Sequence, residues 1–380
     1  MKHRIIHYYK TMHNQNKIEK NRILLVSSDP SMGMIHFAAS IINELVKIKE
    51  LDSYFLLTTK GNNSYQDILS EEALKRSTFI EYPQNKLVNA FYKLIPIDIS
   101  LAIKKITHKN TIKKIHFITG DFRMWSFIKL FPSYEYYYTV HDLSPHERTC
   151  QNNRQKILFK YINWSYQFNT KHINNLITCS NEQYNNLKKI YPNKNVYLSH
   201  FPSLVNNKIK NGIEKVKELE GINNYILFFG GVDYYKGVDI LIEAYKQIQT
   251  SQPLVIAGKG IQFKGHNIIT VNRVIKDEEL KDLFDKASIV VYPYRSITMS
   301  GVLSIAYYFK KNTIVSDLAF FLQNKSQNTF VFKRNDIQSL ATTLGKALNN
   351  PVNMANAYDE VYSNKQSSQE YLNFYNPIYQ

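Results

Sequence analysis

Three stretches of this 380-residue sequence place glycine, lysine or histidine at the end of a predicted strand. The first is ILFFGGVDYYKGVDILIEAY (226–245), in which an apolar run ends at Gly230 and Gly231, and Lys236 precedes an amphipathic helical pattern. Backbone N–H groups at a helix start and a nearby ammonium both attract an anion. We therefore predict an anion site at Lys236. The alternative is a plain turn with a solvated lysine, because the spacing is not GxxxxGK[ST].

The second stretch is VYPYRSITMSGVLSIAYYF (291–309), where a predicted strand, a polar loop and a helix follow one another. Ser300 is a suitable N-cap for this helix, and Arg295 supplies a cation nearby. Free N–H groups at a helix start bind anions, and two such sites with cations suit a diphosphate. The amides concerned are those of Ser300, Gly301 and Val302. The alternative is that Ser300 is an ordinary helix cap.

The third stretch is YYYTVHDLSPH (136–146), whose strand delivers His141 and Asp142 to its C-terminal end. A histidine there can donate a hydrogen bond or polarise a substrate hydroxyl, although a lone histidine is more often structural. A metal site of His141, Asp142 and His146 is disfavoured, because their spacing crosses a proline loop and matches no known ligand pattern. Gly33 lies in the matching turn after the first strand and allows a ligand to approach closely, or forms a plain turn.

Alternating strands and helices must position these residues. Predicted strands lie at 22–28, 53–57, 114–119, 136–140 and 174–179, and then at 225–229, 254–257, 289–292 and 313–315. Helical spacing predicts helices at 276–286, 300–310 and 338–348. The predicted fold class is α/β, with two Rossmann-like doubly wound domains facing across a cleft at the C-terminal ends of their strands.

The break in this pattern divides the chain. A lysine-rich stretch without a strand signal separates the two halves. The predicted parts are a basic N-terminal preamble (1–21), an N-terminal acceptor domain (22–205), a linker (206–221), a C-terminal donor domain (222–355), and a tail (356–380) that packs back on the N-terminal domain.

The composition excludes several classes of protein. The formal net charge is +17, which favours partners that carry phosphate, such as nucleotides, nucleic acids or anionic lipid. A hydrophobic content of 44% excludes a disordered chain. The two cysteines, Cys150 and Cys179, exclude a disulfide framework and a thiolate zinc site, and indicate a reducing compartment. No apolar run is long enough for a membrane span, and the first 21 residues lack a secretory signal.

Taken together and in order, these segments resemble family 4 glycosyltransferases, which have the GT-B fold. ILFFGGVDYYKGVDILIEAY resembles the strand, glycine turn and Lys-Gly helix of that family, and LVIAGKG its next strand and turn. NRVIKDEELKDLFDKASIVVYPY resembles the base-binding loop and the helix and strand after it, and SGVLSIAYYFKKNTIVSD the diphosphate-binding helix. TVHDLSPH and ITCSNEQYNNLKKIYP resemble segments of the family's N-terminal half.

The resemblance implies a retaining transfer of a sugar from a nucleotide diphosphate sugar, with no cofactor and no required metal. Lys236 would hold the donor phosphate, His141 would lie near the donor sugar, and Gly33 would approach the phosphates from the other domain. The other implied donor-binding positions are Gly230, Gly231, Arg295, Ser300, Gly301 and Val302, with Arg273 and Val274 near the base.

The sequence departs from the family at two places. Gly231 stands where the family often has arginine, so phosphate neutralisation would depend more on Lys236, with help from Arg295. Ile297 and Ile305 stand where the family has two glutamates, the second of which commonly binds ribose hydroxyls. A non-catalytic binder of sugar nucleotides, or a scaffold, is therefore the second hypothesis. A basic nucleic-acid-binding protein is the third, but no known nucleic-acid motif supports it.

The positive charge suggests that the protein meets its acceptor at an anionic membrane surface. Residues 86–110 mix apolar residues with lysines and contain one acid, Asp98. Such a segment is either a core helix with a solvated lysine face or a segment that lies on anionic lipid. Because acceptors in the family are frequently lipid-linked, we expect a protein of the cytoplasm, peripheral to the inner face of the membrane, that adds a sugar to a cell-surface glycan.

Overall fold

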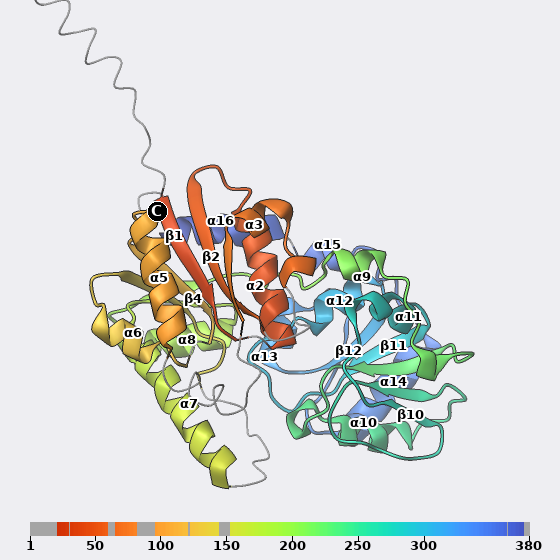
Figure 1. Ribbon diagram of the computed structural model, residues 1–380. Coiled ribbons are helices and arrows are strands. Elements are labelled where there is room, and N and C mark those ends of the chain that lie inside the picture. The colour runs from red at the N-terminus through yellow and green to blue at the C-terminus, as the bar shows by residue number, and fades with distance from the viewer. Residues whose placement is uncertain are drawn as a thin grey trace, which may run out of the picture.

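The computed structural model describes residues 21–29, 31–59, 65–81, 96–120, 122–143, 153–362 and 364–375. Nearly all of the predicted preamble, part of the 86–110 segment and His146 lie outside these residues. The described chain forms two parallel sheets, each with helices packed on it (Figure 1). This confirms the predicted class of two facing doubly wound domains.

The N-terminal sheet has seven strands in the order β3-β2-β1-β4-β5-β6-β7. Its strands are β1 (Asn21–Ser27), β2 (Leu51–Thr59), β3 (Ser77–Glu81), β4 (Lys114–Thr119), β5 (Glu135–Thr139), β6 (Asn175–Thr178) and β7 (Asn195–Leu198). Its helices are α2 (Met32–Leu45), α3 (Glu71–Lys75), α5 (Ile97–Lys109), α6 (Trp125–Leu130), α7 (Asn153–His172) and α8 (Asn181–Ile190).

The C-terminal sheet has six strands in the order β10-β9-β8-β11-β12-β13. Its strands are β8 (Tyr225–Phe229), β9 (Leu254–Ala257), β10 (Ile268–Val271), β11 (Ala287–Tyr292), β12 (Asn312–Ser316) and β13 (Phe330–Phe332). Its helices are α10 (Val238–Tyr245), α11 (Leu280–Asp285), α12 (Val302–Tyr308), α13 (Ala319–Asn324) and α14 (Ile337–Asn349).

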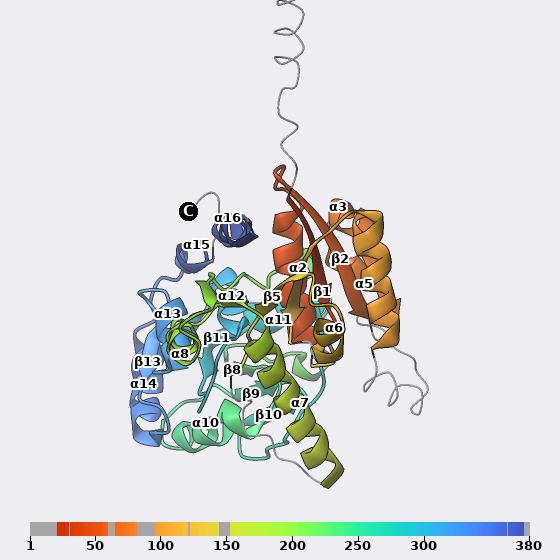
Figure 2. The ribbon, with the colours of Figure 1, turned by 90° about the vertical axis from the view of Figure 1, so that its left-hand side faces the viewer.

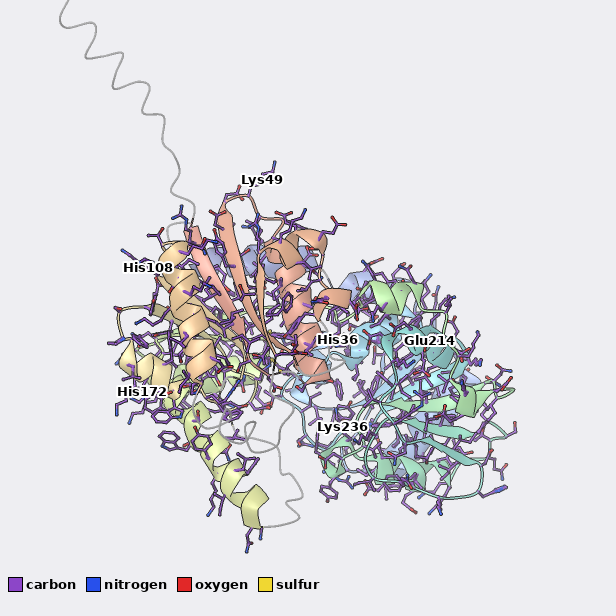
Figure 3. The ribbon with its side chains drawn as sticks, in the orientation of Figure 1. His36, Lys49, His108, His172, Glu214 and Lys236 are labelled. Carbon is purple, nitrogen blue, oxygen red and sulfur yellow. The ribbon has the colours of Figure 1, made fainter. Side chains whose placement is uncertain are left out.

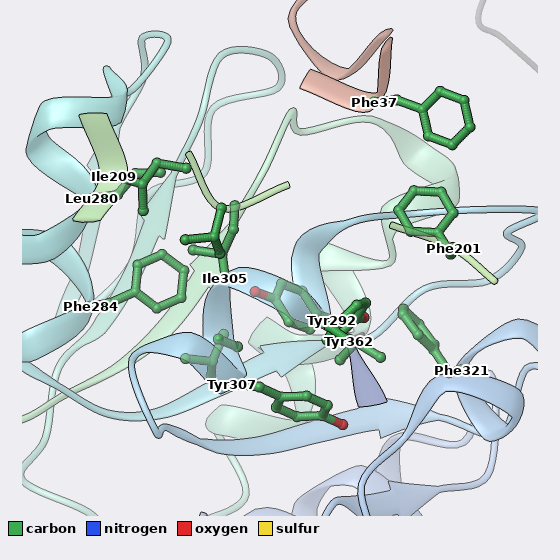
Figure 4. Close-up of a cluster of buried hydrophobic side chains, with 14 of the residues drawn as sticks. Phe37, Phe201, Ile209, Leu280, Phe284, Tyr292, Ile305, Tyr307, Phe321 and Tyr362 are labelled. Atoms are coloured by element: carbon green, nitrogen blue, oxygen red, sulfur yellow. The ribbon is translucent and has the colours of Figure 1, made fainter. Parts of the chain in front are cut away.

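Central strands form because their side chains can be buried on both faces. β8, β9 and β11 are almost wholly buried, as parallel strands covered by helices require. Phe37 of α2 packs against Phe201 (Figure 4). The ring of Phe201 in turn meets Phe320 of α13, so the two domains share an apolar contact. The C-terminal ends of both sets of strands are thereby held on either side of a common space.

The segment between the domains is fastened to the C-terminal one. Residues 206–221 contain α9 (Asn207–Asn211), followed by a short 3-10 turn. Glu218 forms an ion pair with Arg273 at 2.7 Å, and Lys215 pairs with Asp282 at 3.0 Å. Lys208 of α9 also pairs with Asp67 of the N-terminal domain at 3.1 Å, so the segment contacts both domains, and the chain itself passes between them just before Asn206.

The end of the chain returns to the N-terminal domain. α15 (Ala357–Val361) packs against α12 of the C-terminal domain, and α16 (Asn364–Tyr375) packs against α2 (Figure 2). The hydroxyl of Tyr375 meets Nδ1 of His116 at 2.6 Å, and Lys114 donates to the Tyr375 carbonyl oxygen. The chain therefore crosses between the domains twice.

One local prediction is wrong, and a second is confirmed with a difference in its first turn. Ser300 is not the N-cap of the helix after β11, because that helix begins at Val302 and its N-cap is Gly301, which makes no side-chain cap bond. The helix predicted at 276–286 begins as a 3-10 turn, Asp277–Glu279, and becomes α-helical from Leu280. The Glu279 carboxylate accepts a bond from the Lys276 backbone N–H, which fixes the tighter first turn.

Candidate functional site

A cavity of about 510 Å³ lies between the two sheets. The first turn of α2, which contains Gly33, and the residues after β5 line it from the N-terminal domain. The prediction that Gly33 lies in a turn before the helix is wrong, because α2 already begins at Met32. The turns after β8 and β9 and the start of α12 line it from the C-terminal domain. Concave sites at the C-terminal ends of parallel strands are where α/β folds bind ligands.

His141 stands on the N-terminal wall, directly after β5. Its Nε2 donates to the carbonyl oxygen of Ile118 at 2.8 Å, and its ring meets Phe37 edge-on at 4.9 Å. Removal from water lowers the pKa of His141, which keeps the ring neutral at physiological pH. With Nε2 used as donor, Nδ1 is left as an acceptor for a hydroxyl hydrogen. Gly33 lies on the same wall, and a Cβ added there would meet no heavy atom within 4 Å.

Lys236 stands on the opposite wall, at the end of a 3-10 turn, Tyr234–Lys236, and not inside α10. Gly237 joins the turn to α10 in the left-handed conformation, with φ +66°. Figure 3 shows Lys236 on the side of the C-terminal domain that faces α2 and His36. Loss of water around the ammonium lowers the pKa of Lys236 to about 7.

The glycines after β8 and β9 let two turns run against each other. Gly230 has φ +136° and Gly258 φ +152°, and a Cβ on Gly258 would come within 1.9 Å of the Gly230 carbonyl oxygen. The Val232 N–H donates to the carbonyl oxygen of Lys259 at 3.0 Å. Gly231 is different, since the nearest atom to a Cβ there is 3.9 Å away. Gly258 is thus required to be glycine by this close approach, as is Gly260, whose Cβ would lie 2.0 Å from the Val232 carbonyl oxygen, while Gly230 is required by its positive φ.

The start of α12 completes the same wall. Ser300, Gly301 and Val302 all line the cavity. A Cβ on Gly301 would come within 2.0 Å of the Leu204 side chain, so the interdomain passage lies directly against this helix start. The Leu204 N–H donates to Oγ of Ser304 at 3.1 Å, which holds that contact.

The two arginines that were predicted to bind the donor form ion pairs outside the cavity. Arg295 makes a bidentate ion pair with Asp239, at 2.7 and 2.6 Å, and lies over the ring of Tyr234, beside a separate hollow. Arg273 pairs with Glu218 and Glu279, and only its neighbour Val274 lines the cavity. The structure therefore brings Lys236 together with His141 and with Ser300, Gly301 and Val302 at the start of α12, but not with Arg295 or Arg273.

Several residues that line the cavity were not predicted from the sequence. Lys259, in the AGKG turn after β9, lines the cavity as a second lysine, and its turn was visible in the sequence. Nε2 of His36 meets Oδ2 of Asp277 at 2.8 Å, which links α2 to the C-terminal domain. Asn206 donates to the same oxygen at 2.7 Å. No local pattern could reveal a bond between residues so far apart in the chain.

One part of the wall is apolar. Ile297 and Ile305 both line the cavity, and Ile305 lies near Ile209 and Leu280 (Figure 4). Isoleucine side chains accept no hydrogen bonds, so a hydroxyl-rich part of a ligand gains no side-chain partner from these two positions. Within the described chain, no three His, Cys, Asp or Glu side chains are grouped as metal ligands would be.

Comparisons with known proteins agree with this fold. Residues 223–350 match the family model described as glycosyl transferases group 1. Sucrose-phosphate synthase from Thermosynechococcus elongatus is 15% identical, with a TM-score of 0.66 over 95% of this chain and 99% of that one. Anabaena HepE in complex with UDP and glucose is 12% identical, with a TM-score of 0.67 over 92% and 98%.

The lipopolysaccharide outer core galactosyltransferase WaaB is 10% identical, with a TM-score of 0.57 over 93% of this chain and 98% of that one. No curated protein matches the sequence. At these identities the solved structures show a shared fold, while the family model identifies the C-terminal domain.

Proposed function

We propose that the protein is a glycosyltransferase that transfers a sugar, with retention of configuration, from a nucleotide diphosphate sugar to a lipid-linked glycan acceptor in cell-surface polysaccharide synthesis. The match of residues 223–350 to the glycosyl transferases group 1 model supports this proposal. The observation that carries this proposal is the cavity wall formed by Lys236 and the first amides of α12, with His141 opposite. HepE, with the same fold, was crystallised with UDP-glucose.

The chemistry follows from where charge develops. As the bond between the sugar and the diphosphate breaks, negative charge grows on the departing nucleoside diphosphate. Fixed N–H groups and an ammonium stabilise that charge without reorganising, which lowers the barrier. We propose that Lys236 and the α12 amides do this without a metal, while Nδ1 of His141 accepts a hydrogen bond from a hydroxyl of the donor sugar.

A second candidate is a non-catalytic binder of sugar nucleotides. The observation that favours it is the apolar pair Ile297 and Ile305 in the cavity wall. Slow release of free nucleoside diphosphate from the donor in water supports the enzyme. Donor binding without any turnover, with several acceptors tried, supports the binder instead.

A thermal-shift screen of nucleotide sugars tests the donor class. A ligand that binds only the native state stabilises it by RT ln(1 + [L]/Kd), about 2.7 kcal/mol at a hundredfold excess over Kd. We expect at least one nucleotide diphosphate sugar to raise the melting temperature, and the matching nucleoside and free sugar to leave it unchanged. Failure of every nucleotide to shift the midpoint contradicts the proposal.

We also propose that the protein meets its acceptor at the cytoplasmic face of a membrane, and the support is one flank of the N-terminal domain. The helices α5, α6 and α7 lie along the left-hand side of Figure 1, which faces the viewer in Figure 2. Their sequences contain eight Lys and Arg but a single acid, Asp98. Large apolar side chains are exposed among these charges: Ile97 (52%), Leu101 (64%), Leu130 (70%), Ile157 (68%), Leu158 (41%) and Trp164 (45%).

This combination suits an anionic bilayer better than water. Each Lys or Arg near such a surface contributes about 1 kcal/mol, and tryptophan favours the boundary between headgroups and acyl chains. No helix in the described parts of the chain is long and apolar enough to span a membrane. The proposed contact is therefore a peripheral one, made by α5, α6 and α7.

Vesicle sedimentation tests this contact. We expect vesicles rich in anionic lipid, at low salt, to sediment the wild-type protein, and neutral vesicles to leave it in solution. The double variant Lys156→Glu with Lys160→Glu on α7 should lose most of this binding. The matched variant Lys264→Glu with Lys346→Glu changes the same charge at exposed positions of the C-terminal domain and should keep it. Equal partitioning to both vesicle types contradicts the idea.

A further inference from the structure

The Lys236 ammonium rests on an aromatic surface. Its Nζ lies 3.9 Å from the ring centroid of Tyr294 and 5.0 Å from that of Tyr235. Tyr294 follows β11 by two residues and is 0% exposed. The negative face of an aromatic ring attracts a cation, and the attraction grows as water is removed.

The Tyr294 ring is itself held in place. Its centroid lies 5.2 Å from that of Phe321 on α13, 5.9 Å from that of Tyr292, and 6.4 Å from that of Tyr235. These contacts join the ring to β11, to α13 and to the turn that carries Lys236. A ring packed on three sides offers the ammonium a fixed position, and not a mobile contact.

No protein carboxylate balances this cation directly. Among the residues that the structure describes, no carboxylate forms an ion pair with Lys236, and the acid before its own turn, Asp233, accepts the Tyr234 N–H at 2.7 Å. The other titratable or charged groups that line the cavity are Tyr235, Lys259, His141, Asp142, and the paired His36 and Asp277.

We propose that Tyr294 is a positioning residue, whose ring holds the Lys236 ammonium at the cavity wall in place of a carboxylate, so that the donor diphosphate is the counter-ion of this lysine and donor binding takes up a proton. The inference rests on the proposed function. It adds a positioning residue to that site and a proton to the binding step.

The proton uptake follows from the two environments of the amine. In the empty site, loss of water holds the pKa of Lys236 near 7, and the attraction of Asp233 opposes this only in part. A diphosphate beside the ammonium favours the charged form and raises that pKa. Above pH 7, binding must therefore supply the missing proton, and donor affinity falls by up to tenfold for each further pH unit. Below pH 7 the amine is already charged and affinity levels off.

Two measurements on the full chain test the inference. The first follows acylation of the Lys236 amine between pH 6 and 9 by peptide mass spectrometry. We expect half-maximal reactivity near pH 7, and protection by UDP or by inorganic pyrophosphate. The second is calorimetry with UDP between pH 7.5 and 9, in buffers of different ionisation enthalpy. Here we expect uptake that approaches one proton for each UDP bound.

Three variants distinguish the effect of the Tyr294 ring on UDP binding from a general loss of stability. Tyr294→Leu removes the aromatic surface and should weaken UDP binding about tenfold, as expected for a desolvated cation–π contact. Tyr294→Phe keeps the ring and should recover most of the affinity. The matched control is Tyr307→Leu, because Tyr307 is equally buried but makes no contact with Lys236. It should lower the melting temperature and leave UDP affinity unchanged.

The outcomes distinguish this inference from the proposed function. If the amine becomes reactive only near pH 10, or if Tyr294→Leu binds UDP as well as wild type does, the inference is overturned and the donor site stands. If the amine is reactive at pH 7 but neither UDP nor pyrophosphate protects it, both the diphosphate site and the inference built on it are overturned.

Discussion

Lys236→Ala should abolish the slow hydrolysis of the donor, with a loss of about 10²- to 10³-fold in rate. The ammonium of Lys236 is held at the cavity wall, where charge develops on the departing diphosphate, and the alanine variant leaves that charge to the α12 amides alone. The measurement is release of free nucleoside diphosphate from the nucleotide sugar that gives the largest thermal shift.

Arg295→Ala is the control for this loss. The guanidinium of Arg295 is engaged by Asp239 beside a different hollow, so its removal should change the rate by about twofold or less, as for other surface ion pairs. Equal losses in the two variants would show that the charge of the region, and not the position of Lys236, supports the reaction.

Gly258→Ala should destabilise the donor domain by about 3 kcal/mol or more, because overpacking and backbone strain act together. The new Cβ would lie 1.9 Å from the carbonyl oxygen of Gly230, and φ at this position is +152°. Separating the two turns would also displace Gly230 and Lys259, so donor binding should be lost with stability. Urea unfolding and the thermal shift with the donor measure both effects.

Gly231→Ala is the matched substitution in the facing turn. Its nearest neighbour is 3.9 Å from the new Cβ, and its backbone conformation does not require glycine. We expect the free energy of unfolding to stay within about 0.5 kcal/mol of wild type. A stability for Gly258→Ala as high as this one would contradict the close approach of the two turns.

The strands that the sequence predicts and those that it misses differ in one physical respect. All nine predicted strands are inner strands, with runs such as YILFF (225–229) that are buried on both faces. The four missed strands are the sheet edges, β3, β7, β10 and β13. An edge strand has one neighbour and is partly exposed, so it needs no continuous apolar run and leaves a weaker signal.

In the site, some residues are positioned by the strands next to them in sequence, and others by contacts with residues far away in the chain. His141 lies two positions after β5, and Lys236 and Ser300 lie in the loops that follow β8 and β11, so their arrival at the cavity follows from the ends of those strands. Arg295 stays away from it because its partner, Asp239, lies 56 positions earlier in the chain. Tyr294 gains its role from Phe321 and from the turn at Lys236, neither of which is next to it in sequence. Contacts of this kind have no local pattern from which to read them.

The double crossing of the chain determines where the molecule can bend. Residues 206–221 are fastened to the C-terminal domain by Glu218 and Lys215, and α16 to the N-terminal domain by Tyr375. Any opening of the cavity must therefore be absorbed where the chain passes between the domains, which in the described chain includes residues 199–205. Two neighbouring crossings that bend together define one axis of rotation between the domains. Entry of the donor and departure of the product would then be a rotation whose axis is set by covalent connectivity, and such a rotation must break the bond from His36 to Asp277.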